Sequence, residues 1–373
     1  MMFYERVLVF TFMTGVSHND QALFTSVVLT GGPPRPEKTV RALQSLNEQT
    51  FKGIQKILIN NARPDEEIDY LRRADALTAD WEVIQFSKSE YKKGDYGSVW
   101  RVPGNRALDI AKGKYIFFQS DDDFLAPDFF EKISALFDKY PIAICGSGTS
   151  VEYIWETGEF RTKSGSWLQR PEIESGRSVI HKSHIDSSYI DNQTFSLVME
   201  IAKVKEVRDY IFEAGFPETN CLYQVGLRGY IVFDSSAKMY WGKHNGQDNR
   251  SWKLDNVLYS SNRFLFDSIL RCNFLALQKF VPDSQAEWKL LRKSFNSFLA
   301  QRSTQILFDR FLQKIRLIPT PVHLIGKKID VGSHLVSICR NPSQAILSIW
   351  QVFTGAISGG IRKFFGKRVK KNH

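Results

Sequence analysis

The chain has 373 residues, of which 43% are hydrophobic and 24% are charged, a composition typical of a soluble globular protein with room for two compact units. Its four cysteines lie far apart, which excludes a disulfide framework and the close cysteine pairs of structural zinc sites. An apolar stretch at residues 7–13 is too short for a membrane span or an export signal, so we expect a protein of the reducing cytosol.

The net charge of +10 is concentrated at the C-terminus. Residues 311–373 contain eleven Lys and Arg but one acid, Asp330, which leaves residues 1–310 neutral. A patch that binds nucleic acid is expected on the folded body among aromatic side chains, and this charge lies in a terminal segment instead. We therefore expect no nucleic-acid partner, and we interpret the tail separately from the body.

Strands and helices are predicted to alternate through the first third of the chain. Helical spacing of apolar residues predicts helices over residues 37–50, 64–78, 105–113 and 126–137. Apolar runs rich in β-branched and aromatic residues predict strands over residues 24–30, 54–60, 81–86 and 114–120. This alternation favours an α/β fold with a mostly parallel sheet flanked by helices. Ligands of such sheets bind beyond the carboxyl ends of the strands.

Polar residues follow three of these predicted strands. Thr30 ends the first, Asn60 and Asn61 end the second, and the carboxylates of Asp121–Asp123 follow the fourth. Adjacent carboxylates repel one another unless solvent, hydrogen bonds or a cation relieves them. One interpretation is an acidic turn that caps the helix over residues 126–137. The position at strand ends favours a binding site, with hydroxyl and amide groups for a base and ribose and carboxylates for a divalent cation that bridges a diphosphate.

A Walker-type NTPase is disfavoured because the sequence has no GxxxxGK[ST] motif. An ordinary dinucleotide dehydrogenase is disfavoured because no GxGxxG follows the first strand. Instead, two segments carry a family resemblance. Family-2 glycosyltransferases of the GT-A fold are similar to this chain in "SVVLT…RALQSLNEQTFKGIQKILINN…GNRALDIAKGKYIFFQSDDDFLAPDFFEKI" and in "EAGFPETNCLYQVGLRGYIVF…YWGKHNGQDN". The resemblance covers residues 25–250. It implies a nucleotide-sugar donor, a divalent metal (Mn or Mg) and sugar transfer with inversion.

The resemblance also implies roles for individual residues. The general base that deprotonates the acceptor is Glu218, at the start of a helix, although an acid favoured there by the helix dipole is the alternative. Asp191 and Asp209 are weaker candidates for the base, without support from the family motifs, and Lys243 or Arg250 could help to neutralise phosphates. The metal ligands are Asp122 and His244, and Asp123 either supports them or caps a helix. The nucleotide-sugar ligands are Thr30, Asn60, Asn61, Asn105 and Asp121.

Two departures from the family pattern bear on activity. Family members usually carry Asp-Asp where this chain has Asn60 and Asn61, and often an Asp where it has Ser120. These differences keep a non-catalytic module that binds nucleotide or glycan as an alternative. A nucleotidyltransferase is another alternative, although "GGPPRPEK" is only a faint version of the basic, Gly-rich loop it would need after the first strand. Residues 163–176 are interpreted as a surface loop, in which Trp167 is the one hint of sugar stacking.

The C-terminal third changes character. We predict an N-terminal segment (1–24), a GT-A-like domain (25–250), a helical extension (251–318) and a basic amphipathic tail (319–373) that begins near "PTP". The tail is too polar to span a membrane. Its apolar stripe and basic end are typical of a helix lying on an anionic membrane, whereas a core helix with a solvated end is the alternative. The stripe comprises Ile346, Ile349, Phe353, Ile357, Ile361 and Phe364.

Together these features predict transfer of a single sugar to a glycan or a lipid-linked acceptor, as in the assembly of bacterial surface polysaccharides. A processive synthase is disfavoured because the sequence has neither a multi-span region nor a Gln-x-x-Arg-Trp motif. The predicted location is the inner face of the cell membrane, where the protein would be peripherally associated through its tail.

Overall fold

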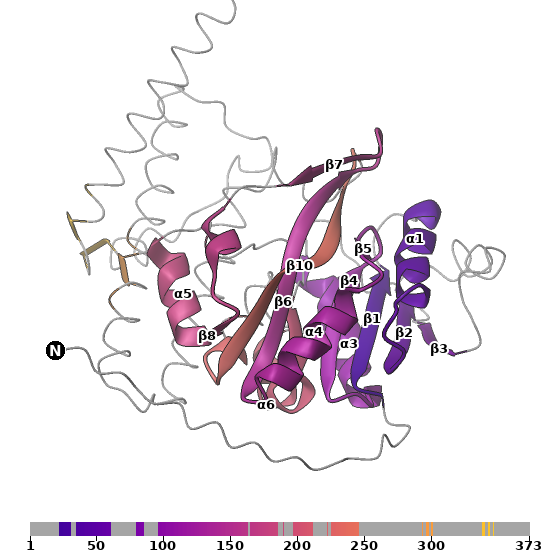
Figure 1. The fold of residues 1–373 in the computed structure, drawn as a ribbon, viewed down its shortest axis with the longest axis horizontal. Helices are drawn as coiled ribbons and strands as arrows, with labels where there is room; N and C mark the ends of the chain where they lie inside the picture. The colour runs from indigo at the N-terminus through magenta and orange to yellow at the C-terminus, as the bar shows by residue number, and fades with distance from the viewer. Residues whose placement is uncertain are drawn as a thin grey trace, which may run out of the picture.

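A ten-stranded sheet forms the centre of the protein in a computed structural model. The structure describes residues 22–30, 35–60, 80–85, 96–162, 165–185, 189, 197–211, 222 and 225–245, with single positions between 293 and 346. The strands pair in the order β3-β2-β1-β4-β9-β6-β10-β5, and β7 and β8 pair with β6 and β10. Figure 1 shows this sheet with helices on its two faces.

The first half of the sheet is parallel. It contains β3 (Trp81–Gln85), β2 (Ile54–Asn60), β1 (Phe24–Thr30) and β4 (Tyr115–Ser120). These strands begin and end within one residue of the predicted ones, because buried strands of a parallel sheet leave continuous apolar runs in the sequence. The strands are connected in part by α1 (Pro36–Asn47) and α3 (Tyr96–Ile110). The predicted helix over residues 64–78 lies outside the described residues.

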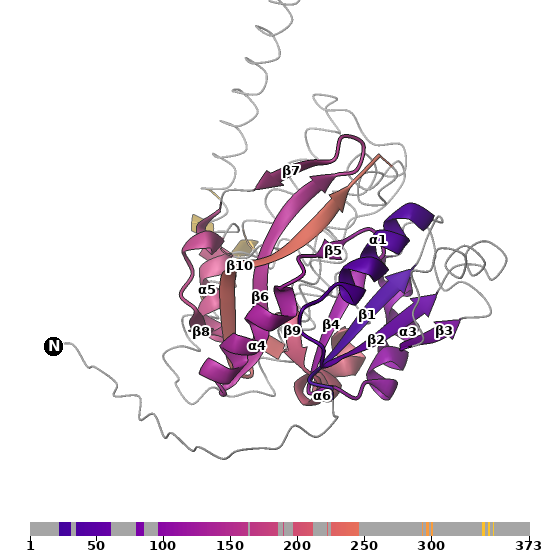
Figure 2. The same cartoon turned by 45° about the vertical axis from the view of Figure 1, so that its right-hand side comes forward.

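The second half of the sheet mixes strand directions. Its two long strands, β6 (Ala143–Ile154) and β10 (Tyr230–Lys243), run parallel to each other. The remaining strands are antiparallel to their partners: β5 (Phe124–Leu125), β7 (Glu159–Thr162), β8 (Ile173–Ser175) and β9 (Leu197–Glu200). Figure 2 shows β7 alongside the outer end of β6, at the opposite side of the molecule from α6 (Ile201–Ile211). The predicted α/β class is thus confirmed, with antiparallel pairs added to a parallel framework.

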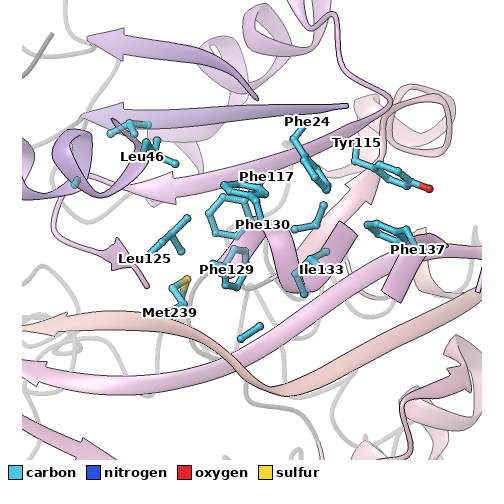
Figure 3. Packing of buried hydrophobic residues seen from close by; sticks show 14 of the residues in the cluster. Phe24, Leu46, Tyr115, Phe117, Leu125, Phe129, Phe130, Ile133, Phe137 and Met239 are labelled. Carbon is cyan, nitrogen blue, oxygen red and sulfur yellow. The ribbon is translucent and has the colours of Figure 1, made fainter. Parts of the chain in front are cut away.

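Two apolar layers fix the helices on the sheet. On one face, α1 and α4 (Phe129–Lys139) pack over a cluster rich in phenylalanine, in which Phe24, Phe117 and Phe130 are fully buried (Figure 3). On the other face, α3, α5 (Gly176–Ile185) and α6 contribute apolar side chains to a second cluster around Phe118. Because both faces are covered, the carboxyl edge of the parallel strands is where polar side chains can gather.

Two expectations about local structure were wrong. The helix predicted to begin at Asn105 begins at Tyr96 and includes Pro103, because tertiary packing overrides the breaking tendency of single residues. Residues 165–176 are not an irregular surface loop but contain a 3₁₀ turn, η1 (Ser166–Gln169), and β8. Trp167 is only 3% exposed and packs edge-on against Phe233, with ring centroids 6.2 Å apart, so it is a core residue and does not stack on sugar.

The predicted domain boundaries remain predictions. In the C-terminal third, the described positions 293, 296, 297, 300, 338, 339, 342, 343 and 346 are helical. Ala300 is fully buried, whereas Ile346, the first residue of the predicted apolar stripe, is 69% exposed. Among the residues that the structure describes, no helix is long and apolar enough to cross a membrane.

Candidate active site

Three buried carboxylates lie at the carboxyl end of β4. Asp121, Asp122 and Asp123 form a turn in which the Asp123 N–H donates to the Ser120 carbonyl, and the chain then enters β5. We call these three residues the aspartate loop. The following helix, α4, has Asp128 as its N-cap, so the aspartates do not cap it. The interpretation of the aspartates as a cap for the next helix is therefore excluded.

The end of β10 brings a histidine onto this loop. Because β10 pairs with β5, through Tyr240 opposite Phe124, the residues after β10 lie beside the aspartate loop. His244 Nε2 lies 3.0 Å from Asp122 Oδ2, and both side chains are buried. Burial acts to raise the pKa of Asp122, but the hydrogen bond with His244 and the positive charge of Arg35 outweigh it and hold this pKa below its usual value. The carboxylate is thus kept ionised.

A glycine permits this close approach. An added Cβ at Gly242 would lie 2.0 Å from the carbonyl oxygen of Asp122, a backbone atom that cannot move aside alone. The Gly242 N–H donates to Asp123 Oδ1 at 2.9 Å, and the Trp155 indole N–H donates to the Asp122 carbonyl at 3.2 Å. Asp123 therefore attaches the loop to β10, a supporting role rather than that of a ligand.

An arginine that sequence reasoning missed completes the cluster. Arg35 is the residue before α1, and its Nη1 lies 3.3 Å from Asp121 Oδ1 and 3.5 Å from Asp122 Oδ2. Its side chain is largely buried. The signal was present in "GGPPRPEK", since any cation just after the first strand lies at the same edge of the sheet as the aspartates.

Polar residues of neighbouring strand ends extend the site. Thr30 and Asn60 are partners in the β1–β2 register, and the Thr30 hydroxyl donates to Asn60 Oδ1 at 2.8 Å. Since β1 lies between β2 and β4, the ends of all three strands meet at one edge. The predicted Thr30, Asn60 and Asp121 are therefore brought to the edge that carries Asp122 and His244. Asn105 lies half-buried in α3.

Other predicted site residues are placed differently or not described. The Lys243 ammonium lies over the Trp241 ring and 3.9 Å from Glu152 Oε1, so its charge is already engaged within the protein. Asp209 lies in α6, whose first residue hydrogen-bonds to Lys114 at the opposite end of β4. The remaining predicted residues lie outside the described part of the chain: Asn61, Asp191, Glu218 and Arg250.

The pair formed by Asp122 and His244 fits two positions around a divalent cation. A carboxylate oxygen and an imidazole nitrogen 3.0 Å apart can both face one ion. Within the described residues, no group of three or more His, Cys, Asp or Glu is arranged to hold a metal by itself. This partial set suits Mg²⁺ or Mn²⁺ more than a structural metal, because Mg²⁺ is usually held by one or two carboxylates together with substrate phosphates.

Comparison with known proteins identifies the domain. The family model of glycosyl transferase family 2 matches residues 35–191, a range that includes Arg35, Asn60 and the aspartate loop. Residues 35–191 are similar to family-2 glycosyltransferases. The resemblance inferred from the sequence is thus confirmed. Because His244 lies outside the matched range, its assignment to the site rests on its contact with Asp122.

Solved structures show the same fold. The crystal structure of S. aureus TarS 1-349 matches with a TM-score of 0.55 and 14% identity, over 84% of this chain and 80% of that chain. TarS 1-349 in complex with UDP-GlcNAc matches with a TM-score of 0.50 and 16% identity, over 76% and 82% of the two chains. No curated protein matches the sequence. At these identities the likeness shows the fold, and the GT-A-like α/β prediction is confirmed.

Proposed function

We propose that this glycosyltransferase moves a single sugar, with inversion and with a divalent cation, from a nucleotide-sugar donor to a hydroxyl group of a glycan or lipid-linked acceptor. The observation that carries the proposal is the buried contact between Asp122 and His244 at the carboxyl edge, beside Arg35. This cluster provides a place for cation and diphosphate together. UDP-GlcNAc, the ligand of the TarS complex, is a natural first donor to test.

Each part of the cluster has a task in this reaction. Thr30 and Asn60 are positioned at strand ends where they can hydrogen-bond a base or ribose. Asp121 faces the ribose and diphosphate, and Asp122 with His244 would hold Mg²⁺ or Mn²⁺. Such an ion, when bound, offsets the charge that develops on the leaving diphosphate. Arg35 adds a second positive group within reach of the phosphates.

Inversion needs a base that deprotonates the acceptor hydroxyl as it attacks the face opposite the leaving group. We assign this role to Glu218, which lies 26 residues before His244 in the sequence. The acceptor hydroxyl would lose its proton to the Glu218 carboxylate while its oxygen bonds to the anomeric carbon. The bond from that carbon to the diphosphate breaks as the new bond forms, and its electron pair leaves with the diphosphate.

We further propose that the tail holds the protein at the inner face of an anionic membrane, which would bring the site to acceptors built on lipid carriers. Two observations support this placement. The tail carries most of the net charge, and Ile346, the first residue of its predicted apolar stripe, is exposed. Basic charge and an apolar face together can give stable attachment where either alone is weak.

The proposal is tested by incubating the protein with a panel of nucleotide sugars and Mn²⁺ or Mg²⁺, and measuring release of nucleoside diphosphate. Slow hydrolysis needs no acceptor, so the unknown acceptor does not limit the assay. We expect one donor to be hydrolysed, chelator to stop the reaction, and Asp122→Asn to abolish it. Nucleotide binding without turnover of any donor would favour a non-catalytic module, and binding of no nucleotide would overturn the proposed function.

A further inference from the structure

One carboxylate oxygen in the site lies close to both a histidine and an arginine. Asp122 Oδ2 lies 3.0 Å from His244 Nε2 and 3.5 Å from Arg35 Nη1. The same Arg35 nitrogen lies 3.3 Å from Asp121 Oδ1, so one guanidinium bridges both aspartates. The single charge of Arg35 thus offsets part of the charge of two buried carboxylates.

Binding of a divalent ion to Asp122 and His244 would make this arrangement unfavourable. The ion needs the oxygen that Arg35 now faces, and two positive groups within a few ångströms repel strongly in a buried site. Arg35 must therefore lose at least its contact with Asp122. Arg35 lies before the first turn of α1 and has non-helical backbone angles (φ −133°, ψ 62°).

A bound diphosphate offers Arg35 a new partner. Guanidinium groups bind phosphate oxygens through paired hydrogen bonds, and the charge-assisted form is among the strongest in proteins. The diphosphate of the donor would lie beside the cation, since substrate phosphates complete the coordination of such ions. Arg35 would then exchange one anionic partner for another without leaving the site.

We propose that Arg35 is an exchangeable counter-cation, which offsets part of the charge of Asp121 and Asp122 in the free enzyme and moves to the donor diphosphate when the divalent ion binds. The inference rests on the proposed function, because it requires diphosphate and metal at this site. It makes Arg35 a competitor of the metal in the free protein and a ligand of the nucleotide in the complex. Metal and nucleotide then favour each other's binding through this side chain, as reciprocal coupling requires.

The alternative is a fixed clamp, in which Arg35 only holds the aspartates in place. The two roles predict opposite effects on metal binding. Removing an exchangeable counter-cation tightens binding of the metal alone, because no ion pair has to be broken first. Removing a fixed clamp weakens it, because the aspartates lose their orientation.

The test is calorimetry of two ligands, Mn²⁺ alone and UDP at saturating Mn²⁺, on wild type, Arg35→Gln and Arg35→Lys. Arg41→Gln is the matched control. Arg41 is an exposed arginine of α1 whose guanidinium lies over the Phe124 ring at 4.9 Å, so the control removes the same charge from the same helix without touching the carboxylates. Thermal melting of every variant shows whether it is folded.

We expect Arg35→Gln to bind Mn²⁺ alone about five- to tenfold tighter and UDP with Mn²⁺ about tenfold weaker, the size of one charge-assisted hydrogen bond. Arg35→Lys should fall between this variant and wild type, and Arg41→Gln should match wild type. Unchanged or weaker Mn²⁺ binding by folded Arg35→Gln overturns the exchange, whatever happens to UDP. A wild type that binds neither UDP nor any other nucleoside diphosphate in the presence of Mn²⁺ refutes the proposed function itself, and this is measured before any variant is made.

Discussion

The contact of β10 with the aspartate loop allows a quantitative prediction for Gly242→Ala. The new Cβ would lie 2.0 Å from the Asp122 carbonyl oxygen and 2.4 Å from Trp155 Nε1. Real Cβ atoms essentially never approach within 3.0 Å of such atoms, so β10 and the loop must separate by about 1 Å. Neither obstacle can swing away by itself, because one is backbone and the other is a hydrogen-bonded indole.

The cost follows from what this separation disrupts. Forcing an extra methyl group into a packed contact costs about 1–3 kcal/mol. The bonds from Gly242 N–H to Asp123 and from Trp155 to Asp122 are both weakened, at about 1 kcal/mol each. A total of about 3–5 kcal/mol corresponds to a fall in Tm of roughly 6–20 °C for a domain of this size. His244, two residues further on, would lose its alignment with Asp122, so Mn²⁺-dependent UDP affinity should fall at least about tenfold.

The matched control is Gly158→Ala. Gly158 has a positive φ of 70°, but its nearest neighbour for an added Cβ is the Tyr153 hydroxyl at 3.8 Å. The control therefore carries only the backbone penalty, about 1–2 kcal/mol, and lies outside the site. Differential scanning calorimetry and UDP titration measure both variants. The prediction is refuted if Gly242→Ala lowers Tm by no more than Gly158→Ala does and also binds UDP normally. In that case the tight β10 contact is not what positions the site.

Three further predictions address the site and the tail. Asp122→Asn should keep the fold but weaken Mn²⁺-dependent UDP binding about tenfold or more, since an uncharged oxygen is a poor ligand for a hard cation; unchanged affinity in calorimetry would move the metal elsewhere. Glu218→Gln should bind donor like wild type and transfer sugar about two to four orders of magnitude more slowly; a rate within a few-fold of wild type would redirect attention to Asp191. The chain truncated after Asn341 should fold and hydrolyse donor but no longer sediment with anionic vesicles, to which the full chain binds in a salt-sensitive way at about 1 kcal/mol per basic residue. Equal sedimentation of both chains, or loss of full-length binding to competing duplex DNA, would contradict a membrane role for the tail.

The sequence predicts the parallel half of the sheet well. Strands such as β1 and β4 are buried on both faces, which leaves continuous apolar runs that only a parallel α/β sheet commonly needs. Short strands such as β5 and β8 were not foreseen. They contain only two or three residues and exist because β10 offers them an edge, and such long-range pairing leaves almost no local pattern.

The sequence predicts those site residues that lie at the ends of the parallel strands. The strand-end residues Thr30, Asn60 and Asp121 follow from topology alone, because parallel strands end at one edge. Arg35 was missed, since a turn rich in glycine and proline does not show which side chain points back over the sheet. The role of Gly242 depends on a contact between segments far apart in sequence, and no local signal reports it.

The segment recognised by the family model does not coincide with the unit that can fold. Residues 35–191 exclude β1, which lies between β2 and β4, and also β9, which lies between β4 and β6. In a fragment cut at these limits, β4 would lack the strands on both of its sides, and open strand edges would be exposed to other chains. During synthesis on the ribosome, β4 and β6 cannot be joined until β9, residues 197–200, emerges. Until then the nascent chain is vulnerable to misassembly through these open strand edges. The shortest autonomous fragment should therefore begin before Phe24 and extend past His244.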